Sequence, residues 1–262
     1  MNLTQSARLL NRLYLRLWHS LRKQLRYVQD HMQPPDSVVL VITAMVVGMG
    51  TGYGAVIFIW IVSQLELLDE WLQTAVGASA GLLLLMVGSG LIVGFIVHRG
   101  AAEVEGGGIP EVMEAVALRG GRIRGRVAPL KMMASALTIG TGGSAGREGP
   151  MVQIGSALGS LVGQLLHFPT PRVRTLVACG AAAGVSAAFN APIAASLFAL
   201  EVVLGKFTVR YFGAVVISAV SAGIVARASL GEQPAFLVPS YDFVPGELSL
   251  YALLGILAGL VA

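Results

Sequence analysis

Apolar residues run through this chain in long segments, which polar or glycine-rich stretches separate. The segments lie at about 38–65, 75–97, 127–145, 151–166, 175–200, 211–226 and 249–262. A helix needs about 20 apolar residues to span the hydrocarbon core of a bilayer, so several segments predict full spans while others are too short. Short segments interrupted by glycine or proline are typical of a binding site at mid-membrane. The pattern predicts an all-α integral membrane protein with broken helices.

Composition agrees with this class. Of the 262 residues, 55% are hydrophobic and only 12% are charged, whereas a soluble domain carries about 25% charged residues. The single cysteine, Cys179, excludes an intrachain disulfide and lies among small apolar residues, so we expect it to serve packing. The chain is predicted to be a multi-pass membrane protein.

The first 33 residues form a basic unit, separate from the predicted transmembrane domain at 37–262. Their cations and a row of leucines predict an amphipathic helix at the membrane surface, in preference to a nucleic-acid-binding arm. By the positive-inside rule this helix is cytoplasmic. The acidic stretch Glu66 to Trp71 is then predicted to be an outside loop, and no signal peptide is visible. The cations are Arg8, Arg12, Arg16, Arg22, Lys23 and Arg26.

Several other features have structural interpretations. Glycines four residues apart, such as Gly48/Gly52 and Gly155/Gly159, predict faces where helix backbones approach closely. Asn190 is predicted to cap the helix that follows Pro192. A turn with four arginines is predicted to be a solvated cytoplasmic loop; it contains Arg119, Arg122, Arg124 and Arg126.

The stretch at 140–150 carries the strongest chemical signal. It reads Gly140-Thr141-Gly142-Gly143-Ser144-Ala145-Gly146-Arg147-Glu148-Gly149-Pro150, with five glycines and two adjacent opposite charges between apolar segments. A charge at the bilayer centre costs about 3 kcal/mol even on lenient scales, so such groups line a water-filled path or bind a ligand. Glycines let backbone N–H groups approach a ligand, and Pro150 suits the first turn of a helix. We therefore expect a helix whose N-terminal end faces an anion.

Two other interpretations of these glycines fail. A phosphate-binding P-loop requires a lysine after its closing glycine, and none is present here. The spacing Gly140-x-Gly142-x-x-Ala145 matches a relaxed dinucleotide fingerprint. That match is weak, because no βαβ context surrounds it.

The residues at 146–150 resemble the G-R/K-E-G-P signature of the CLC family of chloride channels and proton/chloride exchangers. Gly106-Gly107-Gly108-Ile109-Pro110 resembles the G-S-G-I-P signature of that family, with one departure. The segments 181–184, 189–192 and 198–201 also fit the family, and the resemblance runs from about residue 40 to the end of the chain.

The resemblance implies an inverted-repeat helical bundle that works as a homodimer, with a chloride path in each subunit. The chain resembles the first repeat and the start of the second, so we expect it to be incomplete at its C-terminus. Glu148 matches the gating glutamate of the family, whose carboxylate occupies an anion position and swings away when protonated. Lys131 matches a lysine that makes the pore potential positive, although a lysine that snorkels to the membrane surface would look the same. The anion is expected to contact residues of both signatures: Gly106, Gly107, Gly108, Ile109, Pro110, Gly146, Arg147, Glu148, Gly149 and Pro150.

The chain departs from the family at two positions. Gly107 replaces the serine whose hydroxyl binds the central anion, at a cost of about 1 kcal/mol for one hydrogen bond. Chloride remains the expected substrate, with nitrate as an alternative. Val202 stands where the exchangers carry a proton-accepting glutamate. The neighbouring Glu201 is turned by about 100° on an α-helix.

These residues predict a passive chloride channel or a poorly coupled carrier, located in the cell membrane and gated by Glu148. The alternative is a proton/chloride antiporter whose proton route avoids position 202. A truncated, noncatalytic subunit stays open as a further alternative. We do not expect an enzyme that uses Arg147 and Glu148 as acid and base, because the four histidines (His19, His31, His98 and His167) fall at segment ends. No metal or cofactor is expected.

Overall fold

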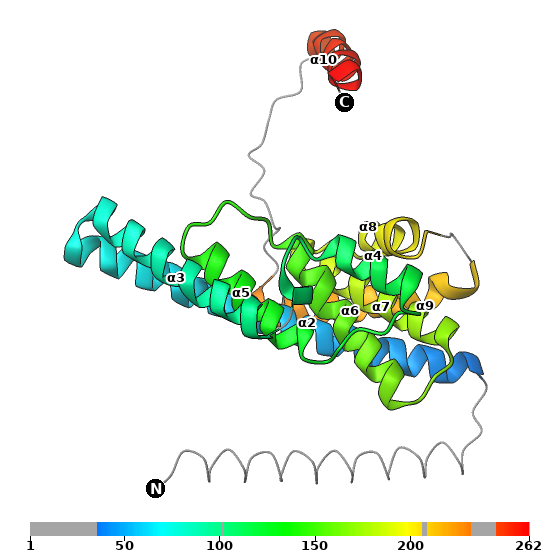
Figure 1. The fold of residues 1–262 in the computed structure, drawn as a ribbon. Helices are drawn as coiled ribbons and strands as arrows, with labels where there is room; N and C mark the ends of the chain where they lie inside the picture. Colours follow the sequence, from blue (N-terminus) through cyan, green and yellow to red (C-terminus); the bar gives the residue numbers. More distant parts are fainter. Residues whose placement is uncertain (1–35, 101, 206–208, 232–244, 262) are drawn as a thin grey trace, which may run out of the picture.

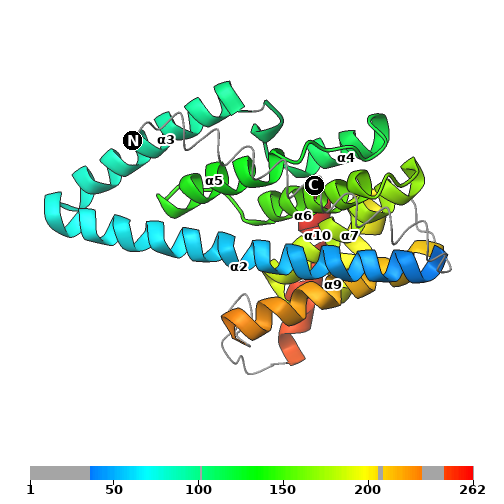
Figure 2. The ribbon, with the colours of Figure 1, turned by 90° about the horizontal axis from the view of Figure 1, so that it is seen from below.

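The computed structural model describes residues 36–100, 102–205, 209–231 and 245–261, and every regular element within these ranges is helical (Figures 1 and 2). The predicted helix at 1–33 lies outside the described residues. The elements are α2 (Asp36–Val76), α3 (Ala78–Gly100), η1 (Ala102–Val104), α4 (Ile109–Leu118), α5 (Val127–Gly140), α6 (Glu148–Leu165), α7 (Thr170–Phe189), α8 (Pro192–Phe198), η2 (Ala199–Val203), α9 (Val209–Leu230), η3 (Pro245–Glu247) and α10 (Leu248–Val261).

The bundle is organised around α2, which contacts α3, α5, α6, α7 and α9. Helix α3 folds back beside α2, and α5 packs against both (Figure 2). Helices α6 and α7 form the largest contact between two elements, and α4 and α8 lie on one side of them (Figure 1). Helix α10 stands apart from the bundle in Figure 1, and none of its residues is buried. In the described ranges α2, α3 and α9 are long and apolar enough to cross a membrane.

The acidic stretch Glu66 to Trp71 is not a loop, contrary to the prediction. Helix α2 continues through it for 41 residues and ends only at Val76. The physical reason is that Leu65, Leu67, Leu68 and Leu72 are good helix formers and no glycine or proline interrupts them. The turn into α3 falls instead at Gly77, whose φ of 99° is open to glycine and strained for other residues.

Helices α6 and α7 pack in an antiparallel pair through their small residues. A Cβ on Gly155 would collide with the carbonyl oxygen of Gly180, and a Cβ on Gly180 would collide with that of Gly155. One turn to either side, Gly184 meets the Met151 carbonyl and Gly159 meets the Leu176 carbonyl in the same way. The predicted close approach of backbones is confirmed along this pair. The contact holds α6 in place, and the second of the two signatures lies at the start of α6.

The predicted glycine face at Gly48 and Gly52 of α2 is also close-packed. Gly48 and Gly52 lie against the backbone of α9 at Ser218 and Ala222. Gly50 has open space around the position of a Cβ. The predicted close approach is therefore confirmed at Gly48 and Gly52, and the neighbouring Gly50 takes no part in it.

The prediction that Asn190 caps the helix after Pro192 is wrong. Asn190 is the C-cap of α7, in the left-handed conformation with φ 57° and ψ 34°, and Ala191 precedes α8. Asparagine tolerates this conformation better than most residues, which suits it to ending a helix. The Asn190 side-chain oxygen accepts a hydrogen bond from Nε of Arg227 on α9. The break between α7 and α8 is as predicted, and the role of the asparagine is reversed.

Candidate anion site

Helix α6 begins at Glu148, directly after the glycine-rich link from α5. Arg147 is its N-cap, and Glu148 stands at the first helical position. The Glu148 carboxylate bends back so that a Cβ on Gly146 would collide with its Oε2. A carboxylate there lies at the positive end of the helix dipole, where an anion would be stabilised. Among the described residues no ion pair joins Arg147 to Glu148, as expected for adjacent helical side chains.

The starts of α4 and α6 meet backbone to backbone. A Cβ on Gly149 would collide with the Gly107 carbonyl oxygen, and a Cβ on Gly108 would lie 2.6 Å from the Gly149 carbonyl oxygen. Gly108 also has a φ of 102°, so glycine is required there by both space and conformation. The structure therefore brings the two signatures together, although they are about 40 residues apart in sequence.

Lys131 is buried beside the first signature. Its side chain is only 3% exposed, and its ammonium group donates hydrogen bonds to the carbonyls of Val104 (3.0 Å) and Gly106 (2.7 Å). The alternative of a snorkelling lysine is therefore wrong, because the charge points into the protein. A buried ammonium group needs such acceptors to offset its lost hydration. Lys131 lies where its charge acts on the loop that leads into α4.

The carboxylate of Glu111, in the first turn of α4, caps the start of that helix. No prediction from the sequence included this cap. The Gly108 N–H group donates to Oε2 of Glu111 at 2.7 Å. Gly108 is one of the residues expected to contact the anion, and its N–H group is already bound within the chain. The signal was present in the sequence, because a glutamate three residues after the N-cap is the spacing of a capping box.

Gln153 is a second residue that the sequence analysis missed. It lies on α6, is 2% exposed, and donates from Nε2 to the carbonyl of Glu103 at 2.7 Å. A glutamine in an apolar membrane segment is a signal in itself, because a buried amide requires a partner. The partner lies 50 residues earlier in the chain, and no local pattern could identify it.

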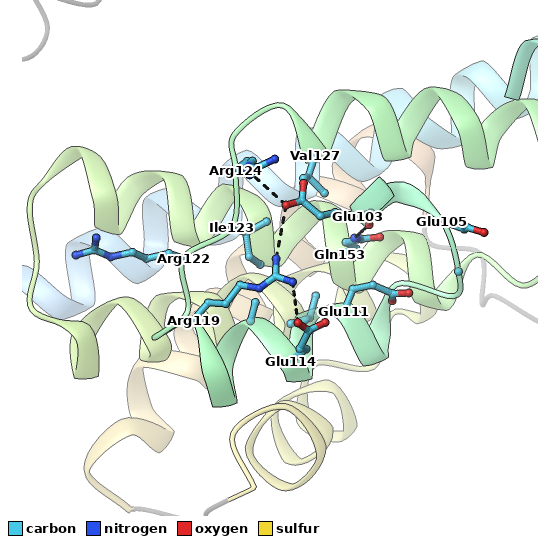
Figure 3. A pocket seen from close by; sticks show the side chains of 13 residues that line it. Glu103, Glu105, Glu111, Glu114, Arg119, Arg122, Ile123, Arg124, Val127 and Gln153 are labelled. Carbon is cyan, nitrogen blue, oxygen red and sulfur yellow. Dashed lines mark hydrogen bonds and ion pairs between the residues drawn. The ribbon is translucent and has the colours of Figure 1, made fainter. Parts of the chain in front are cut away.

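The basic turn is anchored to the protein and is not simply a solvated loop. Arg119 and Arg124 each lie 3.6 Å from Oε1 of Glu103, and Arg119 also pairs with Glu114 at 2.7 Å (Figure 3). These side chains line a hollow of about 410 Å³, together with Glu111 and Gln153. The backbone of the turn is bound to α6 as well, where Ser160 accepts from the Ile123 N–H at 2.8 Å. Its arginines keep their outer sides in solvent, so the prediction is correct only in part.

The segment after α8 is a π-helical turn, η2, whose Leu204 N–H donates to the Ala199 carbonyl. Val202 is half-buried and lines a second hollow of about 690 Å³, together with Glu114 and Arg174. Glu201 is exposed and lies outside the lining of that hollow. The two neighbours therefore face different surroundings, as predicted. The wider π-helical turn changes the angle between them from the α-helical value.

The fold and this site define an all-helical, multi-pass membrane protein in which two broken helices begin at a shared point. A family model described as voltage gated chloride channel matches residues 89–262. The chain belongs to this family, the CLC family, so the resemblance and the predicted fold class are confirmed.

Three curated relatives illustrate the match. The chain is 36% identical over 183 residues to a putative chloride channel protein ClcB-like of Ralstonia nicotianae, covering 68% of this chain and 43% of that protein. It is 34% identical over 252 residues to chloride channel protein CLC-e of Arabidopsis thaliana (88% and 34%). It is 36% identical over 203 residues to the H(+)/Cl(-) exchange transporter ClcA of Vibrio cholerae (74% and 43%). The chain spans about a third to a half of the length of these relatives.

Two solved structures share the fold. One is a slow cyanobacterial Cl-/H+ antiporter, with a TM-score of 0.74 and 27% identity, covering 88% of this chain and 55% of that one. The other is a CLC-type fluoride/proton antiporter, with a TM-score of 0.71 and 27% identity, covering 86% and 55%. Broken helices that begin at glycine–proline motifs are therefore arranged here as in known transporters.

Proposed function

We propose that the protein moves chloride passively across the cell membrane, as a CLC-type channel or a poorly coupled carrier. The anion path runs past the point where α4 and α6 begin, and Glu148 opens and closes it. The protein works as a homodimer with its N-terminus in the cytoplasm, and it needs no cofactor or metal.

One observation carries this proposal: the Glu148 carboxylate folds over Gly146 at the start of α6. A negative group in that place stands in for a permeating anion, because the helix N-terminus stabilises either one. Close by, Gly149 touches the loop of Gly107, and Lys131 places a positive charge behind that loop. The relatives named as chloride channels support chloride as the substrate.

We expect little or no proton coupling, because Val202 cannot bind a proton. The test uses liposomes that contain the full-length protein, with a chloride gradient at equal pH and a pH electrode outside. Chloride should leave the liposomes while the external pH stays constant. Sustained proton movement against its gradient, abolished by Glu148→Ala, would overturn the passive mechanism.

A proton/chloride antiporter is the second candidate, and one observation favours it. Glu114 lines the same hollow as Val202, so a carboxylate lies near the position where the exchangers carry their glutamate. Its Oε1 also pairs with Arg119 at 2.7 Å. The relative named as an exchange transporter and the two antiporter structures agree with this candidate. If protons do move in the liposome test, Glu114→Gln should abolish that movement and leave chloride flux in place.

Gly107 is expected to set the preference among anions. A Cβ at this position meets no atom within 4 Å, and the backbone is not in the left-handed region, so serine fits without strain. Gly107→Ser should raise the preference for chloride over nitrate about fivefold, the value of one hydrogen bond of about 1 kcal/mol. Reversal potentials in mixed chloride and nitrate measure this ratio.

Gly107→Ala is the matched control for that experiment, because it adds the Cβ without the hydroxyl. Its preference should equal that of the unmodified protein. If serine and alanine shift the preference equally, the change comes from bulk, and the hydroxyl does not contact the anion.

A further inference from the structure

We propose that Gln153 is a positioning residue for the anion site, which holds the loop before α4 at a fixed place against α6. This inference rests on the proposed function, since it concerns the same site. Gln153 lies outside the two signatures at 106–110 and 146–150, and its role follows from the contacts of its side-chain amide.

The position of Gln153 on α6 places it at the crossing of the two helices. Residues four apart lie on the same face of a helix, so Gln153 shares its face with Gly149, which touches Gly107. The Gln153 side chain continues that contact one turn further along α6. Its Oε1 lies 3.1 Å from where a Cβ of Gly108 would stand, and its Nε2 reaches the Glu103 carbonyl. One side chain therefore binds one end of the loop at 103–108 and lies beside the other end.

Lys131, which lies on α5, binds the same loop, and Lys131 and Gln153 together are called the clamp below. Together the two side chains bind the carbonyls of Glu103, Val104 and Gly106. The described residues contain no cis peptide bond, and in a trans peptide the N–H group points away from the carbonyl of the same unit. Fixing the Gly106 carbonyl toward Lys131 therefore turns the Gly107 N–H group in the opposite direction. By the same geometry, the bond from Gln153 to the Glu103 carbonyl orients the Val104 N–H group, and Gln153 makes this bond from the helix that carries the gate.

The side-chain amide of Gln153 is buried, and its nitrogen and oxygen differ in their hydrogen bonding. Nε2 has its acceptor, whereas Oε1 has no protein donor within the described residues. A buried oxygen of this kind accepts from water where the space allows it. Gln153 also lines the hollow that contains Glu103 and Glu111 (Figure 3). The orientation with Nε2 toward the Glu103 carbonyl is the one that ties the loop to α6, and that hydrogen bond is what the test removes.

The test measures the half-saturating chloride concentration of the full-length protein in liposomes, which does not depend on how much protein folds. Gln153→Met keeps the length of the side chain and removes the donor. We expect its half-saturating concentration to rise about fivefold, as for the loss of one hydrogen bond of about 1 kcal/mol. Gln153→Glu restores a donor only when its carboxyl group is protonated. In the double variant Gln153→Glu with Glu148→Ala, the gate no longer has a titratable group. The chloride affinity of this double variant should recover as pH falls.

Gln164→Met is the matched control. Gln164 lies on the same helix, and its Nε2 also donates to a backbone carbonyl, that of Ile123 at 2.8 Å, but far from the start of α6. Its half-saturating chloride concentration should stay unchanged. An unchanged value in Gln153→Met, or equal changes in the two variants, would overturn the proposal. If Glu148→Ala alone has no effect, the proposed function fails instead, and the comparison of Gln153 with Gln164 still decides whether the loop is clamped.

Discussion

Replacing Glu148 with alanine is expected to raise chloride flux and to remove its dependence on pH. The carboxylate competes with chloride for the start of α6, where a negative group gains about 0.3–2 kcal/mol. Removing that competitor should increase flux about two- to thirtyfold at a pH where the carboxyl group is ionised. Protonation neutralises the same group, so flux through the unmodified protein should rise as pH falls. In the variant the flux should be high and flat across the pH range.

Two further variants make this prediction specific. Glu148→Gln has no titratable group, so it should also lose the pH dependence, and its side chain still fills space near Gly146. Glu70→Ala removes an exposed carboxylate from α2, away from the site, and should leave both flux and pH dependence unchanged. Flux is measured by chloride release from liposomes between about pH 3.5 and pH 8, a range that includes both the protonated and the ionised form of a glutamate carboxyl group. A Glu148→Ala profile that follows the unmodified protein would show that the gate lies elsewhere.

The largest expected loss of stability is at Gly180, in the contact between α6 and α7. A Cβ there would collide with the Gly155 carbonyl oxygen, and would stand within 2.9 Å of the Ser156 nitrogen. The obstructing atoms belong to the backbone, so no side-chain rotation can relieve them and the two helices must separate. Gly180→Ala should cost about 1–3 kcal/mol, the usual range for an overpacked interior. Loss of contact at this pair would also shift the start of α6, so flux per molecule should fall.

Gly50→Ala provides the control, because a Cβ at Gly50 meets no atom within 4 Å. Both substitutions change a glycine in a long helix to alanine, so they share the same gain in helix propensity. The measurement is the midpoint of thermal unfolding in detergent, followed by the fraction that stays monodisperse. Equal midpoints for the two variants would mean that α6 and α7 can move apart without cost.

Much of the fold followed from the sequence, because glycine and proline mark helix ends by a local mechanism. The breaks before Ile109, Glu148 and Pro192 all lie where the motifs placed them. The prediction failed at Glu66 to Trp71, because acidic residues are compatible with a helix and only the charge pattern favoured a loop. It also reversed the role of Asn190, since an asparagine can cap either end of a helix and tertiary contacts decide which.

The candidate site was predicted in its residues but not in its internal contacts. Motifs identified Glu148 and the two glycine signatures, and their close approach at Gly107 and Gly149 agrees with a shared site. The role of Glu148 as a gate remains a prediction. The bonds from Lys131 and Gln153 to the loop before α4 join positions 25 to 50 residues apart. Such long-range pairs depend on how helices cross, and hydropathy along the chain does not contain that information.

Helix α2 is longer than the hydrocarbon core of a bilayer is thick, so part of it has to lie outside that core. At 1.5 Å per residue its 41 residues extend about 60 Å, against a hydrocarbon thickness of about 30 Å. Even a tilt of 40°, the upper end of the usual range, leaves about 45 Å along the membrane normal. The acidic end of α2 therefore reaches the headgroup layer. Gly48 and Gly52 pack α2 directly against the backbone of α9, so the two helices tilt together. Lipid with a different acyl-chain length that changes the tilt of α2 therefore also changes the tilt of α9.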